Sequence, residues 1–135
     1  MLLDANIFLE AQLAQQHAGP CELLLAKVRD GKARAIVTDF HIDSVVVVME
    51  NCGRGPREVV TFLASLVLYK GLTIYRLGLY DRIKAALAMR DLHLDYDDAL
   101  ALQASRQCSV NRIISYDEHF DSVNSIRRVV PEDLA

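Results

Sequence analysis

The sequence is poor in cysteine and in helix-breaking residues, and it has no long apolar run. Its three cysteines, Cys21, Cys52 and Cys108, are far apart and form no C-x-x-C pair, so neither a disulfide framework nor a zinc knuckle is expected. Six glycines and three prolines are too few for a collagen-like chain or a linker. Apolar stretches such as 59–69 fall short of the ~18 residues of a membrane span, and no cationic segment opens the chain. We therefore expect a cytoplasmic protein without a membrane segment or secretory signal.

Charge of neither sign dominates, which argues against broad, non-specific binding to nucleic acid. The net charge is −3 over 135 residues, of which 52% are hydrophobic and 24% charged, so one folded domain over 1–135 is expected. The acidic residues are unevenly distributed. Residues 91–121 hold only two basic residues but seven acidic ones: Asp91, Asp95, Asp97, Asp98, Asp117, Glu118 and Asp121. This distribution predicts a local acidic pocket.

Short apolar runs alternate with longer helical patterns, which predicts an α/β domain with a mostly parallel sheet of about four to five strands. The expected strands are 1–3, 35–37, 72–77, 112–115 and 126–130. The expected helices are 7–17, 21–30, 38–51, 57–69, 79–90 and 98–107. Asn6, Thr38 or Asp39, and Asp97 are the expected caps of the first, third and last of these helices. The four valines at 45–48 leave the third helix open to a strand alternative.

Polar residues follow several of the expected strands. Parallel sheets place their functional sites outside the carboxyl ends of the strands. The candidates there are Asp4, Thr38, Asp39, Ser115 and Asp117, together with Asp98 at the start of the helix that leads into the fourth strand. Clustered carboxylates repel one another unless a hard cation such as Mg²⁺ or Mn²⁺ neutralises them. Such a cation can activate water for phosphate hydrolysis, whereas the absence of a Gly-rich phosphate loop disfavours a nucleotide-binding fold.

The chain resembles the PIN domain family in four segments that occur in the family's order. They are Leu3-Asp4-Ala5-Asn6, Asp97-Asp98-Ala99-Leu100-Ala101, Ile113 to Phe120, and Val129-Val130-Pro131. The resemblance implies a three-layer α/β/α fold and a metal-dependent ribonuclease that uses Mg²⁺ or Mn²⁺. It also implies an RNA substrate and a homodimer. Because small single-domain members are often VapC-type toxins, an antitoxin protein is a further expected partner.

Carried over residue by residue, the resemblance makes Asp4, Asp98 and Asp117 the catalytic metal ligands. Asn6 and Ser115 become supporting polar residues beside Asp4.

The family has one more acid, a Glu in the helix after the second strand, and here the sequence departs from the pattern. The expected position falls on Ser44. We take the neighbouring Asp43 as the replacement, with Glu50, two turns further along the helix, as the alternative. Asp95 is a further candidate at the rim of the pocket.

The histidines carry no ligand pattern, since His41, His93 and His119 are widely separated, and we expect them on the surface or partly buried. Two other kinds of protein stay open at this point. The absence of an acid at Ser44 is compatible with a PIN-like module that binds RNA or protein without cleaving. A phosphotransfer domain is less favoured, because Asn6 breaks the D-x-D pattern of haloacid dehalogenases and the adjacent acids of a receiver domain are missing.

Overall fold

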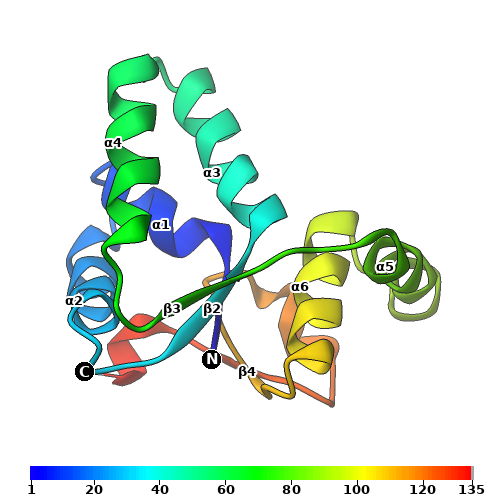
Figure 1. Ribbon diagram of the computed structural model, residues 1–135. Helices are drawn as coiled ribbons and strands as arrows, with labels where there is room; N and C mark the ends of the chain where they lie inside the picture. Colours follow the sequence, from blue (N-terminus) through cyan, green and yellow to red (C-terminus); the bar gives the residue numbers. More distant parts are fainter. Residues whose placement is uncertain (135) are drawn as a thin grey trace.

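The computed structural model describes residues 1–134 and confirms the α/β prediction (Figure 1). Over these residues one parallel sheet has five strands in the order β3-β2-β1-β4-β5. The strands are β1 (Leu2–Leu3), β2 (Ala35–Thr38), β3 (Leu72–Tyr75), β4 (Arg112–Ile114) and β5 (Arg127–Val129). The short β1 lies at the centre, so the residue that follows it is placed in the middle of the sheet's carboxyl edge.

Helices cover both faces of the sheet and complete the expected three layers (Figure 1). One face packs against α1 (Ala5–Gln12), α2 (Ala18–Arg29), α3 (Asp39–Asn51) and α4 (Pro56–Val67). The other face packs against α5 (Leu79–Leu92), α6 (Tyr96–Gln107) and the 3₁₀ segment η1 (Glu118–Ser122). A second 3₁₀ segment, η2 (Pro131–Leu134), follows β5. Within the described range, every helix is too short or too polar to cross a membrane.

Successive strand residues face opposite layers, as a two-residue period requires. Leu2 and Ile113 contribute to the core under α5 and α6, whereas Leu3 and Ile114 contribute to the core under α1–α4. All four side chains are fully buried.

The open assignment at 45–48 is resolved as helix. The Thr38 hydroxyl accepts a hydrogen bond from the backbone N–H of His41 at 3.0 Å and so caps α3. His41, Val45 and Met49 then recur every four residues on one buried face. This capping and burial outweigh the strand preference of the valines.

Two of the expected caps were wrong, each by two residues. Asp4 rather than Asn6 caps α1, because β1 ends at Leu3 and the helix begins at once. Asp95 rather than Asp97 caps α6, since an Asp95 carboxylate oxygen accepts a hydrogen bond from the backbone N–H of Asp98 at 2.9 Å. Both Asp97 and Asp98 therefore lie inside the first turn of α6.

Asp81 is a buried acid with a structural role at the start of α5. One of its oxygens accepts hydrogen bonds from the Gly78 backbone N–H and the Tyr75 hydroxyl, both at 3.0 Å, and the other accepts from the Gln103 amide at 3.1 Å. Burial alone would raise the pKa of Asp81, but these hydrogen bonds outweigh it and lower the pKa. Asp81 thereby ties α5 to β3 and α6.

We expect Asp81→Ala to lower the free energy of unfolding by about 2 kcal/mol, because it leaves buried donors without an acceptor. Urea unfolding followed by circular dichroism measures this change. Asp91→Ala is the matched control, since Asp91 lies exposed on the same helix and its loss should change stability by no more than about 0.5 kcal/mol. Equal stabilities of the two variants would contradict the role of Asp81.

Candidate active site

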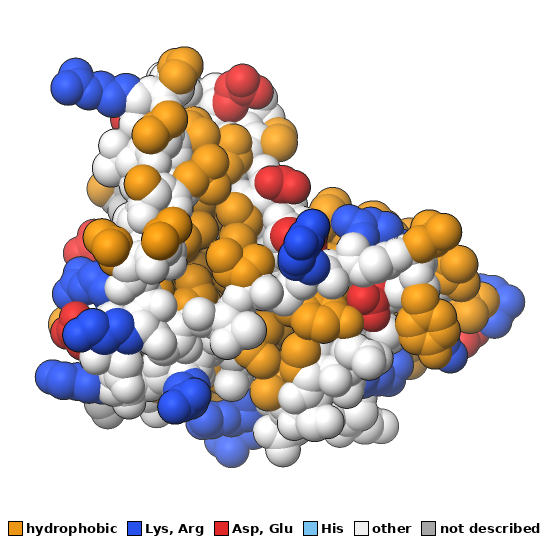
Figure 2. All heavy atoms as spheres, in the orientation of Figure 1, with side chains coloured by type: hydrophobic (Ala, Val, Ile, Leu, Met, Phe, Trp, Pro, Cys, Tyr) orange, Lys and Arg blue, Asp and Glu red, His pale blue; other side chains and the backbone are white. Residues whose placement is uncertain are grey.

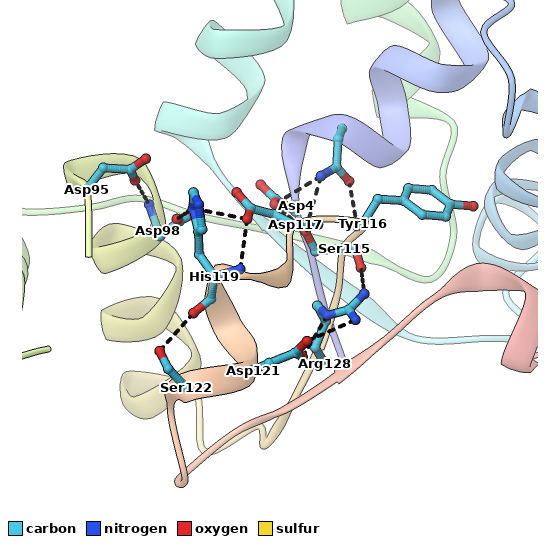
Figure 3. Close-up of polar contacts among 11 residues, drawn as sticks. Asp4, Asp95, Asp98, Ser115, Tyr116, Asp117, His119, Asp121, Ser122 and Arg128 are labelled. Carbon is cyan, nitrogen blue, oxygen red and sulfur yellow. Dashed lines mark hydrogen bonds and ion pairs between the residues drawn. The ribbon is translucent and has the colours of Figure 1, made fainter. Parts of the chain in front are cut away.

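Three acids predicted from two strand ends and one helix start meet at the carboxyl edge of the sheet (Figure 3). Asp4 follows β1, Asp117 follows β4, and Asp98 comes from the first turn of α6. Because β1 and β4 are parallel neighbours, their carboxyl ends lie side by side. The fold therefore brings Asp4 close to Asp117, although the two are more than a hundred positions apart in the sequence.

Asp4 is held in place by hydrogen bonds around both carboxylate oxygens. Oδ1 accepts from the Ala5 backbone N–H at 2.8 Å, and Oδ2 accepts from the Ser115 hydroxyl at 2.6 Å and the Asn6 amide at 3.3 Å. The Asn6 amide also donates to the Ser115 hydroxyl at 3.1 Å. Burial raises the pKa of Asp4 despite these bonds. Asn6 and Ser115 thus take the supporting positions expected from the sequence.

Asp98 and Asp117 share His119 as a neighbour. The His119 Nδ1 atom lies 3.1 Å from Asp98 Oδ2 and 3.0 Å from Asp117 Oδ1. Asp98 is buried, and its burial together with the nearby charges of Asp117 and Asp95 raises its pKa to about 7. The two carboxylates in turn raise the pKa of the exposed His119. The His119 ring therefore lies beside two acids that repel each other.

A second group, which the sequence pattern did not reveal, forms where α3 meets α6. The His41 side chain is fully buried, and its Nε2 atom lies 2.6 Å from Asp97 Oδ1. One ligand atom each of Asp4, His41 and Asp97 lies within 4.8 Å of the others. Burial alone would lower the pKa of His41, but Asp97 and Asp4 outweigh it and raise the pKa. The expectation of surface or partly buried histidines is confirmed for the exposed His119 and wrong for His41, whose side chain is fully buried.

The two candidates for the missing acid of α3 lie elsewhere. Asp43 and Glu50 are exposed on α3, and in the described chain they belong to neither group of possible metal ligands. Asp95, the rim candidate, caps α6 and forms a group with Asp98 and His119 in which the possible ligand atoms lie within 4.8 Å of one another. His41 is the α3 side chain that the structure places beside the acids.

The residues present fit a divalent cation. The site offers the carboxylates of Asp4, Asp97, Asp98 and Asp117 and the imidazole of His41, which are donors of the kind that such cations accept. His41 Nε2 and Asp97 Oδ1 are both buried and form an ion pair at 2.6 Å that is not aligned as a hydrogen bond. Buried polar atoms are normally hydrogen-bonded, so this poorly aligned pair beside Asp4 marks a place suited to a further group.

Comparison with known proteins agrees with this geometry. A family model for the PIN domain matches residues 1–126, whereas no curated protein matches the chain in sequence. Among solved structures, VapC20 from Mycobacterium tuberculosis, described as a toxin that cleaves the sarcin-ricin loop, aligns with a TM-score of 0.74 at 12% identity, covering 91% of this chain and 94% of that one. A toxin-antitoxin complex from Klebsiella pneumoniae aligns with a TM-score of 0.71 at 13% identity, covering 96% of each chain.

The VapBC2 complex from Rickettsia felis, bound to a fragment of its promoter DNA, aligns with a TM-score of 0.66 at 10% identity, again covering 96% of each chain. At these identities the three structures establish a shared fold. The family model rests on the sequence itself and spans almost the whole chain. This protein therefore belongs to the PIN domain family.

Proposed function

We propose that this protein is a metal-dependent endoribonuclease that hydrolyses RNA phosphodiesters. The observation that carries the proposal is the meeting of Asp4, Asp98 and Asp117 at one edge of the sheet, where Asp98 has a pKa raised to about 7. Acids that resist ionisation together become stable as anions when a divalent cation binds between them. Membership in the PIN family supports this function.

Each residue has a distinct task in this proposal. Asp4, Asp98 and Asp117 would hold Mg²⁺ or Mn²⁺, while Ser115 and Asn6 fix the orientation of the Asp4 carboxylate through their hydrogen bonds. A bound cation of this kind lowers the pKa of water and stabilises the charge that develops on a phosphate. His119 is exposed at the mouth of the site, so its imidazolium is placed to meet an entering phosphate group.

The direct test is cleavage of a mixed-sequence single-stranded RNA in Mn²⁺, in Mg²⁺ and in EDTA. We expect cleavage with metal, none in EDTA, and a loss of at least about a hundredfold in Asp98→Asn. Asp30→Asn is the matched control, because Asp30 is exposed and paired only with Arg29, far along the chain from the acids. Equal cleavage by wild type and Asp98→Asn would contradict the assignment.

A protein that binds RNA but neither cleaves it nor binds Mn²⁺ would instead favour the alternative of a PIN-like binding module. That alternative takes its support from α3, which supplies no acid to either group of possible ligands in the described chain.

We further propose that the protein acts as the toxin of a toxin–antitoxin pair and forms a homodimer. The likeness to a toxin-antitoxin complex and to VapBC2 supports the first proposal. Large apolar side chains are exposed over α3, α4 and α5 (Figure 2), and such patches mark protein interaction surfaces. Those more than half exposed are Val47, Val60, Val67, Leu68, Leu79, Tyr80 and Ile83.

A further inference from the structure

His41 brings a buried nitrogen atom to Asp4 and Asp97, whose possible ligand atoms are carboxylate oxygens. Its side chain is fully buried, and Nε2 points at Asp97 Oδ1 from 2.6 Å. The two atoms form an ion pair with each other, but the contact is not aligned as a hydrogen bond. Asp4 completes the group, with the three possible ligand atoms within 4.8 Å of one another. The histidine is therefore aimed into a carboxylate cluster rather than into the apolar core.

The other ring nitrogen is already engaged. His41 Nδ1 lies 2.5 Å from the Thr38 hydroxyl oxygen, which also accepts the hydrogen bond that caps α3. Because Thr38 caps α3 and its hydroxyl contacts the ring three residues later, the imidazole is fixed at both its backbone and its Nδ1 edge. A histidine that binds a metal usually has its second ring nitrogen held in this way. Nε2 is left as the atom that faces Asp4 and Asp97.

We propose that His41 Nε2 is a metal ligand, together with Asp4 and Asp97, and that it makes the site prefer a transition metal such as Mn²⁺ over Mg²⁺. Imidazole is a good ligand for transition metals, whereas Mg²⁺ prefers oxygen ligands and gives up its water reluctantly. An all-carboxylate site lacks this basis for discrimination. The inference rests on the proposed function for its premise that a divalent cation occupies the site.

Pulsed electron paramagnetic resonance of the Mn²⁺-loaded protein tests the ligand directly, because a bound imidazole adds ¹⁴N modulation to the electron spin echo. We expect this modulation in the wild type and its loss in His41→Glu. His119→Gln is the matched control, since His119 is the other histidine beside the acids, and the modulation should survive in it. Circular dichroism of each variant checks folding. If His41→Glu fails to fold, wild type and His119→Gln still decide the question.

Metal preference gives a second readout that does not depend on cleavage. We expect Mn²⁺ to bind the wild type at least about tenfold more tightly than Mg²⁺ by calorimetry, and His41→Glu to remove most of that preference. A wild type that binds Mn²⁺ without nitrogen modulation, or modulation lost in His119→Gln, overturns the role of His41.

An RNA cleavage assay distinguishes a failure of this inference from a failure of the proposed function. Mn²⁺-dependent cleavage without modulation leaves the nuclease standing and removes His41 as a ligand. Modulation without cleavage of any RNA removes the nuclease and retains the metal site. Binding of neither metal overturns both.

Discussion

Asp4→Asn is expected to lower metal-dependent RNA cleavage about a thousandfold while the protein stays folded. Asp4 belongs to the group of possible ligands with His41 and Asp97, and its charge also contributes to the raised pKa of Asp98, which belongs to the other group. Replacing the carboxylate by an amide removes one charge from the centre of the site. The loss of several kcal/mol of charge stabilisation in the transition state corresponds to a rate change of this size.

The same substitution should leave the fold almost unaffected. Asp4 caps α1, and Asn is as good a cap as Asp. The amide oxygen can keep the bond from the Ala5 backbone N–H, and the Ser115 hydroxyl can turn to accept from the new amide group. Removing a buried charge whose pKa is already raised also offsets part of any lost hydrogen bonding. We therefore expect unfolding temperatures within a few degrees of each other, at about 1 kcal/mol of difference or less.

Single-turnover cleavage in Mn²⁺ and a thermal melt in EDTA measure the two effects separately. Asp30→Asn carries the same change of charge at an exposed position and serves as the control. An Asp4→Asn protein that cleaves at the wild-type rate would remove Asp4 from the catalytic site. An Asp4→Asn protein that does not fold would show that the fold requires the Asp4 carboxylate itself, and would contradict the expected stability.

The sequence pattern predicted the parallel sheet and the convergence of Asp4, Asp98 and Asp117, whereas the three layers were expected from the resemblance to PIN domains. The sheet and the convergence follow from local signals. Apolar runs mark the strands, and residues directly after parallel strands must lie at one edge of the sheet. The carboxyl ends of β1 and β4 can be placed side by side from the strand directions alone, without knowledge of side-chain packing.

The inward position of His41 could not be predicted from the sequence, because it depends on the rotation of α3 about its axis. The Thr38 cap fixes that rotation and turns His41 inward together with Val45 and Met49. Asp43, two residues beyond His41, is then about 200° around the helix and exposed. Two observations together point to His41: Thr38 is the cap of α3, and residues 41, 45 and 49 form one buried face of the helix. Asp43 was chosen from the spacing in the family alone, without fixing how α3 is rotated.

Asp97 was missed as a site residue because the cap of α6 lies two residues earlier than expected. With the cap of α6 expected at Asp97, only Asp98 was free to face the pocket. The observed cap at Asp95 places Asp97 and Asp98 side by side in the first turn. One then faces His41 and the other His119. Cap positions are local hydrogen-bond choices among Asp95, Asp97 and Asp98, and sequence patterns do not rank three acids so close together.

Without metal, the protein should become less stable as pH rises from 5 to 8, and Asp98→Asn should be more stable than the wild type at pH 8. The pKa of Asp98 is about 7 in the folded protein, above the ordinary value of 3.8 that it has in an unfolded chain. The folded state therefore binds more protons than the unfolded state between these values, and stability falls as pH rises through this window. The raised pKa values of Asp4 and His41 act in the same direction.

Other titrating groups do not reverse this sign. Asp81 and Asp121 have lowered pKa values, so the stability they contribute is already complete above about pH 4 and stays constant from pH 5 to 8. The Met1 amine has a lowered pKa and acts in the opposite direction near pH 8, but it is present in both wild type and variant. The difference between the two proteins therefore reports Asp98 together with the part of the His119 pKa that the Asp98 carboxylate raises, and both act in the same direction.

We expect Asp98→Asn to raise the free energy of unfolding by about 1–3 kcal/mol at pH 8 in EDTA, and by much less at pH 5, where the folded wild type already carries a neutral Asp98. Urea unfolding at unit steps of pH measures both curves, with Asp91→Asn as an exposed control that should follow the wild type. Saturating Mn²⁺ should reverse the order at pH 8, because the cation stabilises a wild type that keeps all its carboxylate ligands more than a variant that has lost one of them. An Asp98→Asn protein that is less stable than the wild type at pH 8 in EDTA would mean that Asp98 is a structural anchor of α6. In that case Asp98 would stabilise the metal-free fold, and its burial beside other acids would be no evidence for a bound cation.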